Sequence, residues 1–287
     1  HPDALWQNRG FRRRRRRRFR IRSRRGKINR MTDLNIDLRK DLQEIANKEN
    51  ALLMSFVAPD KIVRKSPVSF DYATIKIQDL YKVESEIEIL SNKGILPKKL
   101  HIIIQTPGGD LSTSTKIATY LQQKFQNNII AFVPYEAASG GTMLCLAANK
   151  VVMGETSNIT PIDPQIPYGD GRISANTYEQ ALEEFKKNYG IFRPEEIPSP
   201  YQQMANRFDP VIYKEMTKLS WDIANTAYTL LLTSQVPKTP DETSMLAELV
   251  INLSRSETWP HSHLINSAEA TKIGLNISTD TNHLDLL

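Results

Sequence analysis

Cysteine is nearly absent from this sequence, and several other features are missing altogether. The single cysteine, Cys145, excludes an intramolecular disulfide framework and a zinc site built from cysteines, which suits a reducing compartment. No run of about 18 or more apolar residues occurs, so we predict no membrane-spanning segment. Neither a metal-ligand spacing nor a phosphate-binding P-loop is present. We therefore expect a soluble, cytoplasmic protein with no metal site and no cofactor.

Basic charge is concentrated in the first thirty residues. Residues 1–30 hold thirteen arginines and one lysine against one aspartate, whereas 31–287 hold 24 basic and 31 acidic residues, a net charge of −7. Such a tail cannot bury enough apolar surface to fold, so we expect it to be disordered. One interpretation is an arm that binds nucleic acid through phosphate neutralisation. The alternative that we favour is upstream translated sequence or a cloning remnant, because Met31 opens a sequence of ordinary composition.

The apolar pattern of 31–287 predicts one α/β domain. Continuous apolar runs at 100–105 and 128–135 are typical of strands covered on both faces, and each is followed by a helical pattern. A third strand begins at Lys150. Strands and helices that alternate at such short intervals predict a parallel sheet with right-handed crossovers. Helical patterns dominate from about 175 to 255, so we expect a helical extension there.

A glycine-rich corner follows the first of these strands. In Thr106–Asp110 (TPGGD), the paired glycines Gly108 and Gly109 let the backbone turn with its N–H groups facing outward. The corner opens a helix, whose dipole favours negative charge. Ligand sites in open α/β sheets lie at the carboxyl ends of strands. This corner is therefore a candidate oxyanion hole, although an isolated Pro-Gly-Gly sequence is more often a simple turn.

A second glycine-rich corner, Ala137–Thr142 (AASGGT), follows the next strand. It places Ser139 at the expected start of a helix, where small neighbours leave the hydroxyl exposed. The N–H of Gly140 then faces the same region, as in a nucleophile elbow. Taken alone, such a serine is more often a helix N-cap.

Together the two corners resemble those of the Clp/crotonase superfamily, and more narrowly the serine dehydrogenase proteinase family and the related signal peptide peptidases. Residues 147–153 and Ser157–Gln165 (SNITPIDPQ) are similar to the next segments of that family, with Thr160 in place of a usual glycine. Residues 258–277 resemble its C-terminal closing element. The resemblance covers about 50–280. It implies a parallel sheet with repeated ββα units and a homo-oligomer.

The resemblance implies Ser139 as the nucleophile. The backbone N–H of Gly109 (or Gly108) and the N–H of Gly140 would hold the tetrahedral oxyanion. We therefore expect an ATP-independent serine peptidase that hydrolyses peptide bonds of a peptide or protein substrate through an acyl-enzyme. Two alternatives stay open. A crotonase-like enzyme acting on acyl-CoA thioesters uses the same oxyanion geometry, and a catalytically inactive scaffold uses the same fold.

The general base is left open by the sequence. Clp-type peptidases place a histidine about 25 residues after the serine, but the matching stretch here carries Asp163, which is also suited to a structural role in its turn. Signal peptide peptidases use a lysine. Lys186 and Lys187 fall in that window, in a pattern typical of a solvated helix face. His261 and His263 lie in the C-terminal element, and one of them could fold back to the site. Our candidates are Asp163, Lys186 and His261.

Overall fold

The computed structural model describes most of the chain from residue 40 onward. Every described residue belongs to one compact unit, Leu38–Leu287. The predicted arginine-rich tail over 1–30 lies outside the described residues. The described ranges are 40–57, 63–66, 69–71, 74–168, 171–190, 196–206, 209–255 and 259–278.

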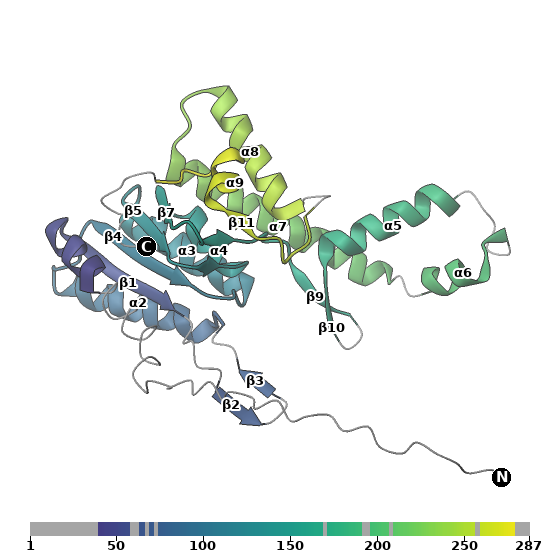
Figure 1. Ribbon diagram of the computed structural model, residues 1–287, viewed down its shortest axis with the longest axis horizontal. Coiled ribbons are helices and arrows are strands. Elements are labelled where there is room, and N and C mark those ends of the chain that lie inside the picture. The colour runs from purple at the N-terminus through teal and green to yellow at the C-terminus, as the bar shows by residue number, and fades with distance from the viewer. Residues whose placement is uncertain are drawn as a thin grey trace, which may run out of the picture. The chain divides into compact units, whose positions relative to one another are not determined.

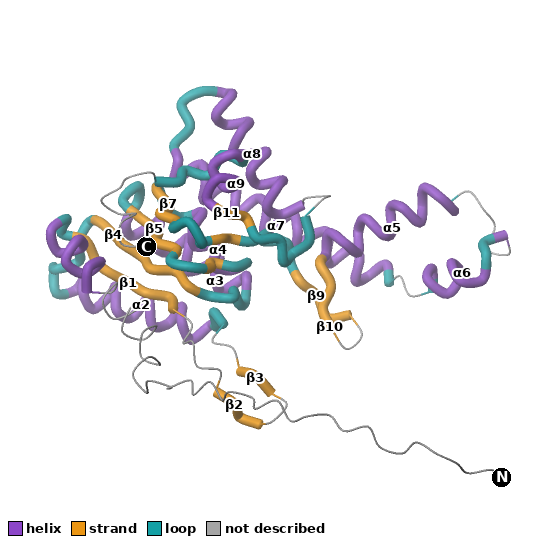
Figure 2. Tube along the Cα trace, in the orientation of Figure 1, coloured by secondary structure: helices purple, strands orange, loops and turns teal. Residues whose placement is uncertain are grey.

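A four-stranded parallel sheet forms the centre of this unit (Figure 1, Figure 2). Its strands, in spatial order, are β1 (Ala51–Val57), β4 (Lys99–Gln105), β5 (Ile129–Val133) and β7 (Lys150–Met153). The predicted parallel sheet is thus confirmed. Successive side chains of a strand face opposite sides of a sheet, and both sides are covered here. Ile102 and Ile104 pack in the main core, whereas Ile103 packs with Leu42 from the helix over 40–48.

Three helices cover the main-core side of the sheet. They are α2 (Ile77–Asn92), α3 (Leu111–Phe125) and α4 (Gly140–Leu146). The α3 helix begins at Asp110, whose carboxylate accepts a hydrogen bond from the N–H of Thr113 at 2.7 Å. This N-cap fixes where the helix starts and therefore where the preceding glycine corner turns.

After β5 and again after β7, the chain enters a second, smaller sheet. This sheet has the order β11-β8-β6. Its strands are β6 (Glu136–Ala137), β8 (Asn158–Ile159) and β11 (Ile265–Asn266). Thr106 extends β4 toward the small sheet through a bridge to Ala137. The succession of β5, β6 and α4 is a ββα unit of the kind that the resemblance implies, and β7 and β8 repeat its two strands. Because β11 pairs with β8, the C-terminal segment returns to this edge.

The expected helical extension follows the sheet. A hairpin of β9 (Gln165–Tyr168) and β10 (Gly171–Ser174) leads into α5 (Ala175–Tyr189), α6 (Ser199–Ala205), α7 (Pro210–Gln235) and α8 (Pro240–Arg255). The α7 and α8 helices pack side by side (Figure 1). Buried hydrogen bonds anchor α7 to the sheet domain, since Gln122 donates to the carbonyl of Leu230 at 2.7 Å and Ser234 to that of Leu146 at 3.0 Å.

The remaining described elements are short. They are the antiparallel pair β2 (Val63–Ser66) and β3 (Ser69–Asp71), and the C-terminal α9 (Ser267–Lys272). None of the helices in the described part of the chain combines the length and the apolar character that crossing a bilayer requires.

Candidate active site

The first glycine corner is fitted tightly between two other backbone segments. Gly108 and Gly109 have positive φ angles of 101° and 156°. A Cβ atom on Gly108 would lie only 2.9 Å from the carbonyl oxygen of Ala138, and one on Gly109 would overlap the backbone of Ile75. The corner therefore requires glycine at both positions. The N–H of Gly108 donates to Oγ1 of Thr106 at 3.2 Å, whereas the N–H of Gly109 has no acceptor within the described residues.

The second corner holds Ser139 in a conformation that residues with a side chain rarely adopt. Its φ is 47° and its ψ is −105°. Such a backbone persists only where the surroundings impose it. Part of this constraint comes from the neighbouring corner, because the backbone of Thr106 pairs with the chain on either side of Ala137. Its N–H donates to the carbonyl of Glu136 at 2.9 Å, and its carbonyl accepts from Ala138 at 3.0 Å. The result is a serine at the tip of a strained strand-to-helix turn.

The two corners converge. A Cβ atom on Gly108 would lie 3.1 Å from Cβ of Ser139 and 3.5 Å from the backbone nitrogen of Gly140. One on Gly140 would lie 3.6 Å from the nitrogen of Gly109. Gly140 is the first residue of α4, so its N–H has no acceptor within the helix. Two backbone donors and one alcohol oxygen are thus gathered in one small region.

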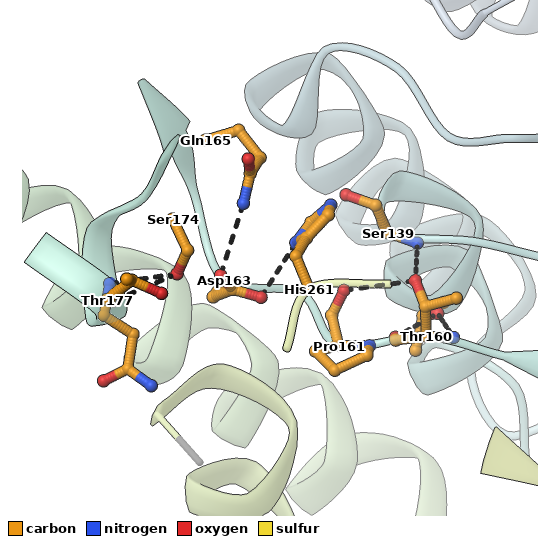
Figure 3. Close-up of polar contacts among 10 residues, drawn as sticks. Ser139, Thr160, Pro161, Asp163, Gln165, Ser174, Thr177 and His261 are labelled. Carbon is orange, nitrogen blue, oxygen red and sulfur yellow. Dashed lines mark hydrogen bonds and ion pairs between the residues drawn. The ribbon is translucent and has the colours of Figure 1, made fainter. Parts of the chain in front are cut away.

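His261 reaches this region from the C-terminal segment. Its Nδ1 lies 2.8 Å from Oδ1 of Asp163. Asp163 is only 5% exposed, and the side-chain amide of Gln165 donates to its other carboxylate oxygen at 3.4 Å. In Figure 3 the imidazole ring lies between the Asp163 carboxylate and Ser139, and the Ser139 hydroxyl faces the ring. A carboxylate on Nδ1 favours the tautomer with its proton there. Nε2 is then left as a proton acceptor on the side of Ser139.

Ser139, Gly109, Asp163 and His261 all line a single cavity of about 710 Å³. One wall of this cavity comes from α7, where Leu219, Ile223 and Thr226 face it. Pro107 and Leu111, beside the first glycine corner, also line it. Its volume falls within the range of about 300–1,000 Å³ that is typical of ligand sites in proteins.

The structure does not bring Lys186 to this cavity. Lys186 lies on α5, where its ammonium contacts the carboxylate of Glu183 at 2.7 Å and lies 5.7 Å from the ring centre of Tyr213. The hydrogen bond from Lys186 to Glu183 raises the pKa of the lysine, which is the opposite of what a lysine base needs. His263 also has a different partner, because its Nε2 lies 3.1 Å from Oε1 of Glu269 and its ring stacks on Trp259.

One contact at the site has no counterpart in our sequence-based expectations. The hydroxyl of Thr160 accepts a hydrogen bond from the N–H of Ser139 at 2.8 Å. The sequence marks Thr160 only as a residue where the family resemblance has glycine. Among the described side chains, no group of three or more histidines, cysteines, aspartates or glutamates is gathered closely enough to hold a metal ion.

Comparison with known families identifies the family of this chain. The family described as "ClpP-like SDH-type serine proteinase" matches residues 28–187, which is more than half of the chain. This chain belongs to that family. The resemblance inferred from the two glycine corners is therefore confirmed, and so is the ClpP-like α/β fold that it implies. The matched range includes Ser139 and Asp163 but ends well before His261.

Similar proteins include two from Methanocaldococcus jannaschii. Uncharacterized protein MJ0137 is 27% identical over 247 residues, which are 84% of this chain and 73% of that protein. Uncharacterized protein MJ1495 is 25% identical over 209 residues, 72% of this chain and 62% of that protein. Among solved structures, a point mutant of the 1510-N membrane-bound stomatin-specific protease is similar with a TM-score of 0.46 and 14% identity, over 81% of each chain.

Proposed function

We propose that this member of the serine proteinase family hydrolyses peptide bonds with Ser139 as nucleophile, His261 as general base and Asp163 as the carboxylate that orients His261. The observation that carries the proposal is the 2.8 Å contact between His261 and the buried carboxylate of Asp163, in the cavity that Ser139 lines. A serine hydroxyl is a poor nucleophile unless a base takes its proton. A histidine held by a carboxylate supplies such a base.

The first half of the reaction forms an acyl-enzyme. Nε2 of His261 takes the proton from the Ser139 hydroxyl as Oγ attacks the carbonyl carbon of the scissile bond. The carbonyl π-electrons move to the oxygen, which becomes the oxyanion. When the intermediate collapses, the C–N bond breaks and His261 gives its proton to the departing amine. An ester of Ser139 with the acyl part of the substrate remains.

The second half reverses these roles with water. His261 takes a proton from the water that attacks the ester, and it returns a proton to Oγ of Ser139 when the carboxylic acid leaves. Asp163 stays ionised throughout and stabilises the imidazolium that forms in each half. No step consumes a nucleotide, so the proposed activity is independent of ATP.

The proposed oxyanion hole consists of the N–H groups of Gly109 and Gly140. Gly108 is the less suitable donor, because its N–H already donates to Thr106. The support for Gly109 and Gly140 is that the two corners approach closely: a Cβ atom built on Gly140 would lie 3.6 Å from the nitrogen of Gly109. Fixed donors at this place cost no reorganisation as the charge develops, and loss of one such donor typically costs about 10²–10³ in rate.

The test is covalent labelling. The full chain is incubated with a fluorophosphonate–rhodamine probe, and the labelled residue is mapped by peptide mass spectrometry. We expect the label on Ser139, no labelling of Ser139→Ala, and normal labelling of Ser112→Ala, a matched control that removes another serine lining the same cavity. Cleavage of fluorescent casein should follow the same order. Labelling that survives in Ser139→Ala contradicts the proposal. An unlabelled chain that coenzyme A protects from proteolysis favours an acyl-CoA enzyme instead.

A further inference from the structure

The hydroxyl of Thr160 lies directly behind the turn that carries Ser139. Thr160 is 4% exposed, and its Oγ1 accepts a hydrogen bond from the N–H of Ser139 at 2.8 Å. The same hydroxyl donates to the carbonyl of Pro161 at 3.3 Å. Figure 3 shows this side chain between the backbone of Ser139 and Pro161. The Thr160 hydroxyl thus accepts one hydrogen bond and donates one, and it links the turn at Ser139 to its own segment 21 residues later.

This contact satisfies a backbone group that the turn leaves without a helical partner. Ser139 is the N-cap of α4, so its N–H makes no bond inside the helix, and its own side chain makes no cap hydrogen bond. The backbone at φ 47° and ψ −105° must be held by its surroundings. The bond to Thr160 also directs the Ser139 N–H away from the oxyanion position. Gly109 and Gly140 remain as the donors there.

Thr160 is itself fixed by a second threonine. Oγ1 of Thr142 lies 2.8 Å from the Thr160 carbonyl oxygen and 2.7 Å from that of Ala137, and it accepts from the Thr160 N–H at 3.2 Å. Because a hydroxyl has one proton, Thr142 donates to one of the two carbonyls at a time. The backbone N–H and carbonyl of Thr160 are therefore both bonded to the first turn of α4, next to Ser139.

The segment that follows Thr160 leads directly to the carboxylate partner of His261. Asp163 comes three residues later, between Pro161 and Pro164, whose rings restrict the backbone. Ile162 adds a backbone bond to the carbonyl of Leu253 on α8 at 2.8 Å. A short, restrained link therefore runs from the Ser139 turn to Asp163. The relative position of the nucleophile and the orienting carboxylate depends on it.

The geometry points to Thr160 as a positioning residue for the reaction proposed above: its hydroxyl holds the Ser139 turn so that the nucleophilic oxygen faces His261. Thr160 contacts neither the substrate nor the reacting atoms, and it acts only through the backbone of Ser139. The inference rests on the proposed function, because it assigns Thr160 a role in the reactivity of Ser139. Displacement of a nucleophile by a fraction of an ångström lowers the rate of attack far more than it weakens binding.

The experiment compares Thr160→Val with Thr160→Ser. Valine keeps the branched shape without the hydroxyl, and serine keeps the hydroxyl. For each full-length variant, the rate of labelling by the fluorophosphonate–rhodamine probe is measured over a range of probe concentrations. We expect Thr160→Val to lower the maximal labelling rate about 10- to 100-fold, with little change in the half-saturating concentration. Thr160→Ser should label at a rate close to that of the unmodified chain.

Ser157→Ala is the matched control for loss of a buried hydroxyl. Its Oγ accepts from the N–H of Gly154 at 2.8 Å and lies in the same segment, but it has no contact with Ser139. We expect this variant to lower the melting temperature without slowing the maximal labelling rate. If Thr160→Val labels as fast as Ser157→Ala, or if Thr160→Ser is as slow as Thr160→Val, the inference is overturned.

A second measurement tests the inference without the variant, in case Thr160→Val does not fold. Hydrogen exchange of the Ser139 amide is followed by NMR in unmodified protein labelled with ¹⁵N-serine. Strong protection is expected, and exchange at the rate of an open amide overturns the inference. This readout also separates the two proposals. If the unmodified chain carries no label on Ser139, the proposed peptidase function fails, whereas the amide protection still reports whether Thr160 holds the turn.

Discussion

Two segments of very different character meet at the proposed active site. The segment over 106–163 supplies the glycine corners, Ser139 and Asp163, and is tied together by the buried hydroxyls of Thr142, Ser157 and Thr160. The segment over 259–278 supplies His261, which is partly exposed. It is attached through the pairing of β11 with β8 and a bridge between Val151 and Ile277.

The two segments hold their functional side chains in different ways. The conformation of Ser139, the proposed nucleophile, is set by hydrogen bonds within the segment over 106–163 that also stabilise the fold. The position of the proposed base depends, among the described residues, on the side-chain contact of His261 with Asp163, which spans 98 residues of sequence. Loss of a hydrogen bond that contacts the Ser139 turn, such as that of Thr160, should therefore alter stability and rate together. Changes at His261 should alter the rate alone.

The largest expected effect separates two neighbouring histidines. His261→Gln removes the proposed base from a partly exposed loop position, so labelling and casein cleavage should fall about 10⁴- to 10⁶-fold, without loss of stability. His263→Gln is the control, because His263 contacts Glu269 and Trp259 instead. Rates measured beside thermal melts test both variants. Equal loss in the two would remove the distinction between these histidines.

The next largest effect concerns Asp163, the carboxylate in the segment over 106–163. Asp163→Asn keeps the shape but no longer favours a proton on Nδ1 of His261, and a change of this kind costs about 10⁴ in rate in a serine protease triad. Asp222→Asn neutralises an exposed carboxylate of α7 that lines the same cavity, and it should leave the rate unchanged. Steady-state kinetics on a fluorogenic peptide measures both. An Asp163→Asn rate near that of Asp222→Asn would exclude the orienting role.

A smaller effect tests the contact between the two corners. Gly108→Ala places a methyl group 2.9 Å from the Ala138 carbonyl oxygen and should lower the labelling rate about 10²-fold by shifting the Ser139 turn. Gly94→Ala imposes a similar backbone strain at φ 68°, but it meets no atom within 4 Å and lies away from the site. That control should cost about 1 kcal/mol of unfolding free energy with an unchanged rate. A normal rate for Gly108→Ala would show that the corners move independently.

The smallest effect lies in the core beneath the nucleophile. Cys145 on α4 is fully buried, and this burial raises the pKa of its thiol to about 12. Since only the thiolate reacts with alkylating reagents, iodoacetamide at mildly alkaline pH should leave the folded chain unmodified and should modify Cys145 after denaturation. Mass spectrometry detects the adduct. Rapid alkylation of the native protein would mean that α4 opens easily, which would contradict the tight packing that we describe for the segment over 106–163.

Much of the first segment could be predicted from the sequence, because its features are local. The runs at 100–105 and 128–135 are mostly apolar, as a doubly covered strand requires, and the structure places both in the central sheet. The glycine corners follow directly, and their convergence is a consequence of adjacent parallel strands. The exposed position of Lys186 also agrees with the solvated helix face that its charge pattern predicts.

The pairing of His261 with Asp163 could not be predicted in the same way. Both residues were candidates, but no periodicity or spacing joins positions 98 residues apart. The family match ends at residue 187, before His261. The role of Thr160 was equally hidden, since its contact with Ser139 depends on how β6 and β8 lie beside each other. Such contacts are products of tertiary packing and leave no local pattern.

The most direct test of the account is a crystal structure of the chain after reaction with a small fluorophosphonate. We predict a phosphonyl group on Oγ of Ser139. One of its oxygens should lie about 2.7–3.1 Å from the backbone nitrogens of Gly109 and Gly140, with Nε2 of His261 on the other side of Oγ. An adduct whose oxygens all face solvent, or a His261 ring turned away from Ser139, would contradict the central claim that the two segments assemble one catalytic centre.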